Sequence, residues 1–112
     1  MRAIEPLCQL SDLEDGDSAS LVAEVGGQKC SLIVVRRDEE VFIYQNICPH
    51  IGAPLDFEPG RFLNLEKDLI QCAMHGALFT IDDGHCVQGP CMGAHLTPVT
   101  SEVRKGAVWL VV

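Results

Sequence analysis

Two short segments of the sequence each carry one cysteine and one histidine. The four side chains are Cys48, His50, Cys72 and His75. Thiolate sulfur and imidazole nitrogen are ligands that zinc and iron accept in proteins. Pro49 and Gly76 favour tight turns that would bring both pairs of side chains to one point. The sequence therefore predicts a metal site built from two loops.

The same segments resemble the Rieske family of [2Fe-2S] proteins. That family has a Cys-x-His segment, a gap, and then a Cys-x-x-His segment, usually followed by a glycine and an aromatic residue, here Gly76 and Phe79. Gly84, Cys86 and the Gly-Pro pair at 89–90 extend the resemblance, which covers essentially the whole chain. The resemblance implies one [2Fe-2S] cluster per chain.

The ligand set would itself make the cluster easier to reduce. The resemblance assigns Cys48 and Cys72 to one iron and His50 and His75 to the other. Two neutral imidazoles in place of two thiolates leave the oxidised cluster with about two fewer negative charges, so that adding an electron costs less. A structural zinc site is the alternative, because a Cys₂His₂ set suits zinc equally well, although zinc fingers usually place like ligands two to four residues apart.

Positions near the ligands indicate a low reduction potential. Where high-potential members of the family have a serine and a tyrosine that hydrogen-bond the cluster, this sequence has Ala77 and Phe79. Ala53 and Met74 stand where those members have cysteines that join the two loops. Without these donors and that disulfide, the resemblance implies a potential near roughly −150 mV, the low end of the Rieske range.

Length and charge limit the function. The chain has 112 residues, which allows a single domain, 1–112, with a modest core. Its net charge of −8 argues against nucleic acid or an anionic membrane as a partner. The acidic balance would suit a basic partner protein, or it would simply keep the protein soluble. Since no apolar segment is long enough for a signal peptide or a membrane helix, we expect a cytoplasmic protein.

Turn signals between apolar segments rich in β-branched residues predict an all-β fold of antiparallel strands. Gly26-Gly27 and Lys105-Gly106 each lie between two such segments and predict hairpins. The expected strands are residues 21–25, 28–35, 41–44, 69–71, 77–81, 100–103 and 107–111. Residues 10–15 could form one helical turn with Ser11 as its N-cap.

The resemblance implies how these strands hold the site. In the Rieske family an antiparallel β-sandwich or barrel forms the base, and a small cluster-binding subdomain is inserted into it. Here that subdomain would span about residues 46–92. Residues 57–68 make the gap between the ligand segments longer than in the commonest bacterial Rieske ferredoxins. Residues 89–90 match the proline loop that covers the cluster in this family.

Other residues with reactive or aromatic side chains have no assigned role as ligands. Four cysteines are expected as reduced thiols: Cys8, Cys30, Cys86 and Cys91. A bridge between Cys86 and Cys91 is the alternative at that spacing. His85 and His95 have no partner spacing and are expected as ordinary solvated or core histidines. Trp109 is expected in the core.

These expectations together predict an electron-transfer protein and not an enzyme. The chain would carry one electron from a flavin reductase to a terminal oxygenase, both of them partner proteins. The alternative is a small subunit of a nitrite-reductase-like enzyme, which has this size and fold. A zinc-stabilised or cluster-sensing interaction module is a third class of function.

Overall fold

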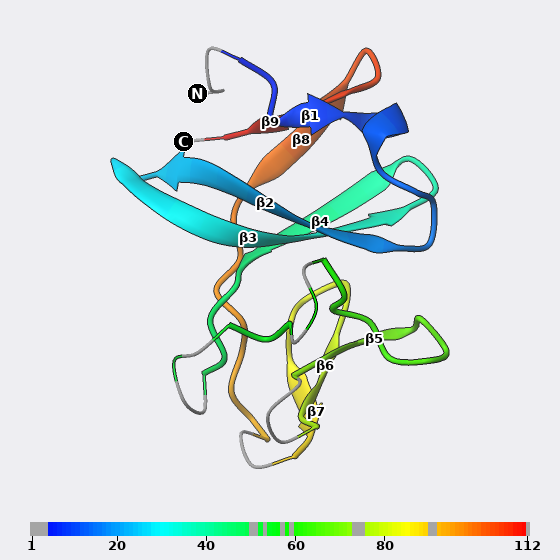
Figure 1. Cartoon of the computed structure of the whole chain (residues 1–112), viewed down its shortest axis with the longest axis vertical. Coiled ribbons are helices and arrows are strands. Elements are labelled where there is room, and N and C mark those ends of the chain that lie inside the picture. Colours follow the sequence, from blue (N-terminus) through cyan, green and yellow to red (C-terminus); the bar gives the residue numbers. More distant parts are fainter. Residues whose placement is uncertain are drawn as a thin grey trace.

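A computed structural model of the chain describes residues 5–49, 52, 54–56, 58, 60–72, 76–89 and 92–111. In this part of the chain, nine strands form three antiparallel sheets of three strands each (Figure 1). The predicted all-β fold is confirmed. The helical residues described amount to one three-residue turn, far short of the long apolar helix that crosses a membrane.

The central sheet is a meander of β2 (Ser18–Val25), β3 (Gln28–Arg37) and β4 (Glu40–Gln45). Gly26 and Gly27 join β2 to β3 with φ angles of 61° and 84°, the left-handed conformation that a two-residue hairpin turn requires. The hairpin predicted from these two glycines is therefore confirmed.

A second sheet has the strand order β1, β9, β8, and its strands are Cys8–Gln9, Ala107–Leu110 and Ser101–Arg104. The predicted hairpin at Lys105 and Gly106 is present, with φ angles of 51° and 75°. The helical turn after β1 is η1 (Leu10–Asp12), and its N-cap is Gln9 instead of the expected Ser11. The Asp12 carboxylate accepts a hydrogen bond from the Gln9 N–H at 2.9 Å, which fixes the start of the turn there.

The third sheet lies below the other two in Figure 1 and consists of β5 (Leu69–Gln71), β6 (Leu78–Thr80) and β7 (Cys86–Gln88). An isolated bridge between Tyr44 and Pro98 links the end of the central sheet to the segment that returns from the third sheet. The third sheet is therefore inserted between β4 and β8 in the chain.

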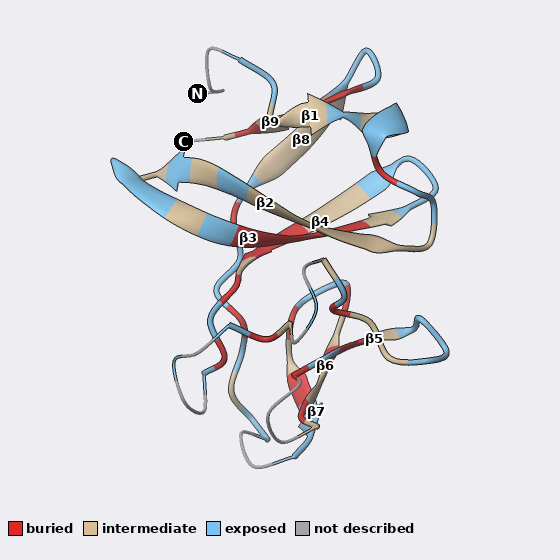
Figure 2. Cartoon of the chain, viewed as in Figure 1, coloured by how far each residue is buried: buried red, intermediate tan, exposed pale blue. Residues whose placement is uncertain are grey.

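Strand β3 is buried on both faces and belongs to two cores. Leu32 and Val34 pack with residues of β9 in the core between the upper two sheets. Ile33 and Val35 belong to the lower core, which contains the buried residues of the third sheet. Because successive side chains of a strand point to opposite faces, one strand serves both cores, as the buried middle of β3 in Figure 2 shows. The lower core also contains the two predicted cysteine ligands.

Trp109 is only partly buried and lies outside both cores, which corrects the expectation that it is a core residue. In β9 the buried neighbours Val108 and Leu110 belong to the upper core. The two-residue period of a strand places Trp109 on the opposite face. Its aromatic character alone did not indicate the face.

Candidate metal centre

Cys48 and Cys72 meet inside the lower core. Their Sγ atoms lie 3.4 Å apart, and the two residues are 1% and 0% exposed. A disulfide bond is about 2.0 Å long, so this distance is that of two separate sulfurs. Two thiolates bound to one tetrahedral ion at about 2.3 Å would lie about 3.8 Å apart. The pair is therefore placed as two ligands of one metal ion would be. His50 and His75 lie outside the described residues, and their role as ligands stays a prediction.

The two cysteine loops close in the same way. The Gly52 N–H donates to the Cys48 carbonyl at 2.7 Å, and the Gly76 N–H donates to the Cys72 carbonyl at 3.0 Å. Both glycines are left-handed, with φ angles of 72° and 68°, a conformation that costs other residues roughly 1–2 kcal/mol. The turn at Gly76 was expected from the sequence, but the matching turn at Gly52 was missed. A glycine four residues after each cysteine was the available signal.

The segment after β7 lies against the second cysteine loop. The Cys72 N–H donates to the Ala77 carbonyl at 2.8 Å. A Cβ atom on Gly89, whose φ is 109°, would lie only 2.8 Å from the Ala77 Cα, so the two backbones approach closely. Pro90 and Cys91 lie outside the described residues. The cover over the cluster therefore stays a prediction, and the alternative of a bridge between Cys86 and Cys91 stays untested.

Asn46 holds the first cysteine loop at its base, a role that the sequence analysis missed. Its side-chain Oδ1 accepts a hydrogen bond from the Leu55 N–H at 2.8 Å. Its Nδ2 donates to Asp56 Oδ1 at 2.9 Å and to Ser31 Oγ at 3.3 Å. Asn46 is 5% exposed, so these partners replace the water that its amide would otherwise bind. A polar residue directly after the apolar strand and two residues before Cys48 was the available signal.

Ala77 and Phe79 share the core of the two thiols and have side chains that cannot donate hydrogen bonds. Both are buried, and both belong to the same apolar cluster as Cys48 and Cys72. A methyl group and a phenyl ring offer no side-chain donor to a metal-bound sulfur. The absence of donors from these two side chains agrees with the low reduction potential expected from the sequence. The potential itself stays a prediction.

His85 and His95 contact each other, which their spacing along the sequence did not indicate. They pair across an isolated β-bridge, with His85 Nδ1 3.0 Å from His95 Nε2 and ring centroids 4.6 Å apart. The contact forms only because the chain returns antiparallel to its own path after β7. Spacing along the sequence could not reveal it.

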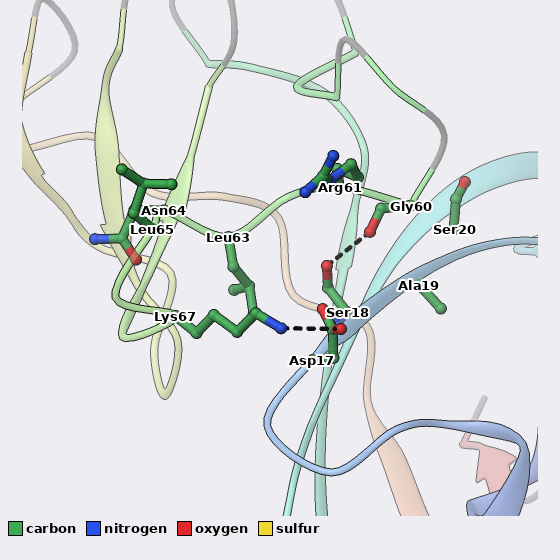
Figure 3. A pocket seen from close by; sticks show the side chains of 10 residues that line it. All are labelled: Asp17, Ser18, Ala19, Ser20, Gly60, Arg61, Leu63, Asn64, Leu65 and Lys67. Carbon is green, nitrogen blue, oxygen red and sulfur yellow. Dashed lines mark hydrogen bonds and ion pairs between the residues drawn. The ribbon is translucent and has the colours of Figure 1, made fainter.

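A surface hollow of about 510 Å³ lies between β2 and the segment 60–67 (Figure 3). It is lined by Asp17, Ser18, Ala19, Ser20, Gly60, Arg61, Leu63, Asn64, Leu65 and Lys67. The Ser18 hydroxyl donates to the Gly60 carbonyl at 2.7 Å, and Lys67 Nζ lies 3.2 Å from Asp17 Oδ2. Partial burial opposes ionisation of Asp17, but the Ser18 N–H and the Lys67 ammonium outweigh it and lower the pKa of this carboxyl. These contacts attach the long segment between the cysteines to the central sheet.

A sequence model of the Rieske [2Fe-2S] domain matches residues 3–105 of the chain. The chain belongs to the Rieske [2Fe-2S] domain family. Its cofactor is accordingly one [2Fe-2S] cluster, which agrees with the buried thiol pair. The family predicted from the cysteine and histidine segments is confirmed.

Known proteins resemble this Rieske domain in sequence and in fold. Cholesterol 7-desaturase of Caenorhabditis elegans is 41% identical over 66 residues, which make up 57% of this chain and only 14% of that much longer protein. Among solved structures, the complex of reduced oxygenase and oxidized ferredoxin in carbazole 1,9a-dioxygenase contains a chain that is 26% identical. The alignment covers 96% of this chain and 100% of that one, with a TM-score of 0.73. Sphingomonas yanoikuyae B1 ferredoxin is 25% identical, with 95% of each chain covered and a TM-score of 0.70.

Proposed function

We propose that this Rieske domain is the ferredoxin component of an oxygenase system, a carrier and not a catalyst. It would take one electron from a flavin reductase and deliver it to a terminal oxygenase. The observation that carries the proposal is the buried Cys48 and Cys72 pair, with sulfurs 3.4 Å apart, in a fold that matches solved ferredoxins over almost their whole length.

Four residues would hold the cluster: Cys48, His50, Cys72 and His75. When bound, the cluster supplies reversible one-electron transfer. Gly52 and Gly76 satisfy the carbonyls of the two cysteines and so fix the course of both loops. The buried side chains at positions 77 and 79 exclude water and offer no donor, which disfavours the extra negative charge of the reduced state.

The docking face would be the rim of the cysteine loops. Ile47 precedes Cys48 and is 47% exposed, and Met92 is 68% exposed. The Met92 N–H donates to the Gly89 carbonyl at 3.2 Å, which places Met92 beside the loop that contacts Ala77. An exposed apolar rim next to a redox centre suits a transient electron-transfer partner. The net charge of −8 would steer a basic partner toward it.

We also propose one domain, 1–112, whose cluster-binding part spans about residues 46–92. The third sheet, together with Cys48 and Cys72, lies within that part. A cytoplasmic location stays a prediction from the sequence.

Stopped-flow reduction by a flavin reductase, followed by transfer to a terminal oxygenase, tests the function. Met92→Ser should slow the reaction at limiting partner concentration and leave the visible spectrum unchanged. The matched control is Val22→Ser, because Val22 is 61% exposed on β2 and should not affect the rate. Added salt should slow reduction as the Debye length falls to about 10 Å and below. Transfer only to a nitrite-reductase-type catalytic subunit would favour the alternative function, and no electron transfer to either would refute the carrier role.

A further inference from the structure

His85 and His95 form a pair of imidazoles away from the cysteine loops. Just before β6, the Ala77 carbonyl accepts a hydrogen bond from the Cys72 N–H. At the other end of β6, the Thr80 N–H donates to the His85 carbonyl at 2.9 Å. At about 3.3 Å per residue, the strand separates these two ends by about 10 Å. The histidine pair is therefore distinct from the cluster site.

The ring nitrogens have the spacing of two ligands on one ion. His85 Nδ1 and His95 Nε2 are 3.0 Å apart. Two nitrogens that each lie about 2.0–2.1 Å from a metal are about 2.9 Å apart at a right angle and about 3.4 Å apart at a tetrahedral angle. We propose that this pair is a second metal site, which takes a late first-row divalent cation such as Ni²⁺, Cu²⁺ or Zn²⁺.

The backbone around the pair holds both residues in place. The Cys86 N–H donates to the Ala94 carbonyl at 2.9 Å, and the Leu96 N–H donates to the Gly84 carbonyl at 2.9 Å. These bonds flank the His85 and His95 bridge on both sides. The two rings share a hydrogen bond at this distance, so binding requires the donor ring to carry its proton on its other nitrogen and both rings to turn toward the ion. The backbone need not move, so little ordering entropy opposes binding.

The surroundings are open to solvent and acidic. His95 is exposed and His85 is partly exposed, so an ion can reach both rings. The Asp83 carboxylate accepts a hydrogen bond from the His85 N–H at 3.1 Å. The same carboxylate also accepts a hydrogen bond from the Thr80 hydroxyl, which holds an acidic group beside the pair.

The donor set selects the class of ion. Imidazole nitrogen suits nickel, copper and zinc, whereas magnesium and calcium prefer oxygen ligands. Among the described residues, no third cysteine, histidine or carboxylate completes the set, and water would fill the other positions. A bound ion would join the start of β7 to the returning segment 92–96 and would stabilise this region of the fold by linkage.

The test is calorimetric titration of the cluster-loaded protein with NiCl₂ alone, with the visible spectrum recorded to show that the cluster stays intact. The wild type should bind one Ni²⁺, and both His85→Gln and His95→Gln should bind at least ten-fold more weakly. Asp82→Asn is the matched control, since it removes a neighbouring charge and keeps both rings, and its affinity should stay within about three-fold of wild type. MgCl₂ should give no binding heat.

Imidazole signals in NMR provide a second readout that does not depend on stability. Substoichiometric Ni²⁺ should broaden the signals of His85 and His95 before any other side chain. Wild-type affinity in His95→Gln, broadening that begins elsewhere, or no binding by the wild type would each overturn the proposal. Because His95 is exposed, its variant remains informative even where His85→Gln folds poorly.

Discussion

Replacing Asn46 by alanine should destabilise the protein and loosen the first cysteine loop. The buried Leu55 N–H would lose its acceptor, and an unsatisfied buried donor costs about 1–3 kcal/mol. The bond to the partly buried Asp56 would add about 1 kcal/mol. The expected loss is therefore about 3 kcal/mol. At about 4 °C per kcal/mol for a domain of this size, the unfolding midpoint should fall by about 12 °C.

Thermal unfolding of the cluster-loaded protein, followed by far-UV circular dichroism and visible absorbance together, measures this loss. Ser31→Ala is the matched control, because it removes only the 3.3 Å contact to Asn46 and keeps the backbone bond from the Asn46 N–H to the Ser31 carbonyl. It should cost less than about 1 kcal/mol.

Asn46→Asp separates the two hydrogen bonds. The new carboxylate would still accept from Leu55 but would face the Asp56 carboxylate, so the variant should regain stability relative to wild type as falling pH protonates one of the two acids. An Asn46→Ala midpoint within about 3 °C of Ser31→Ala, a difference of less than about 1 kcal/mol, would refute the role of Asn46 as the clamp of this loop.

Three further changes give distinct outcomes. Burial, with smaller contributions from nearby acids, raises the pKa of Tyr44 to about 12. The free energy of unfolding in urea should therefore fall as pH rises from about 10 through 12, and Tyr44→Phe should make that fall smaller. Gly89→Ala should lower the unfolding midpoint more than Gly93→Ala. Both glycines have a positive φ, but only a Cβ at position 89 would lie 2.8 Å from the Ala77 Cα. Equal losses would contradict the close approach of the two backbones. The double change Ala77→Ser and Phe79→Tyr should raise the potential in protein-film voltammetry by adding donors, whereas a wild-type midpoint above zero would mean that other groups set it.

Local sequence signals were sufficient for seven of the nine described strands and for the proximity of the two cysteines, but the short strands β1 and β7 were not predicted. Gly26-Gly27 and Gly106 indicated two hairpins because glycine adopts the left-handed conformation of such turns at low cost. Cys48 and Cys72 could be paired because two segments with matching ligand types resemble a known motif. Both kinds of signal depend on a few neighbouring residues.

Contacts between segments that only the tertiary fold brings together were not predictable in this way. The contact between His85 and His95 requires the antiparallel path after β7, and the partner of Asn46 lies nine residues later in the chain. The face on which Trp109 lies depends on the register of β9 against β8. In each case tertiary pairing decides the surroundings, and residue type alone leaves them open.

Iron and acid-labile sulfide analysis of the aerobically purified protein tests the central claim most directly. We expect two irons and two sulfides per chain, and we expect His50→Ala and His75→Ala to lose the normal visible spectrum while His95→Gln keeps it. Zinc without sulfide in the wild type, or an unchanged spectrum in either alanine variant, would contradict a [2Fe-2S] cluster held by Cys48, His50, Cys72 and His75.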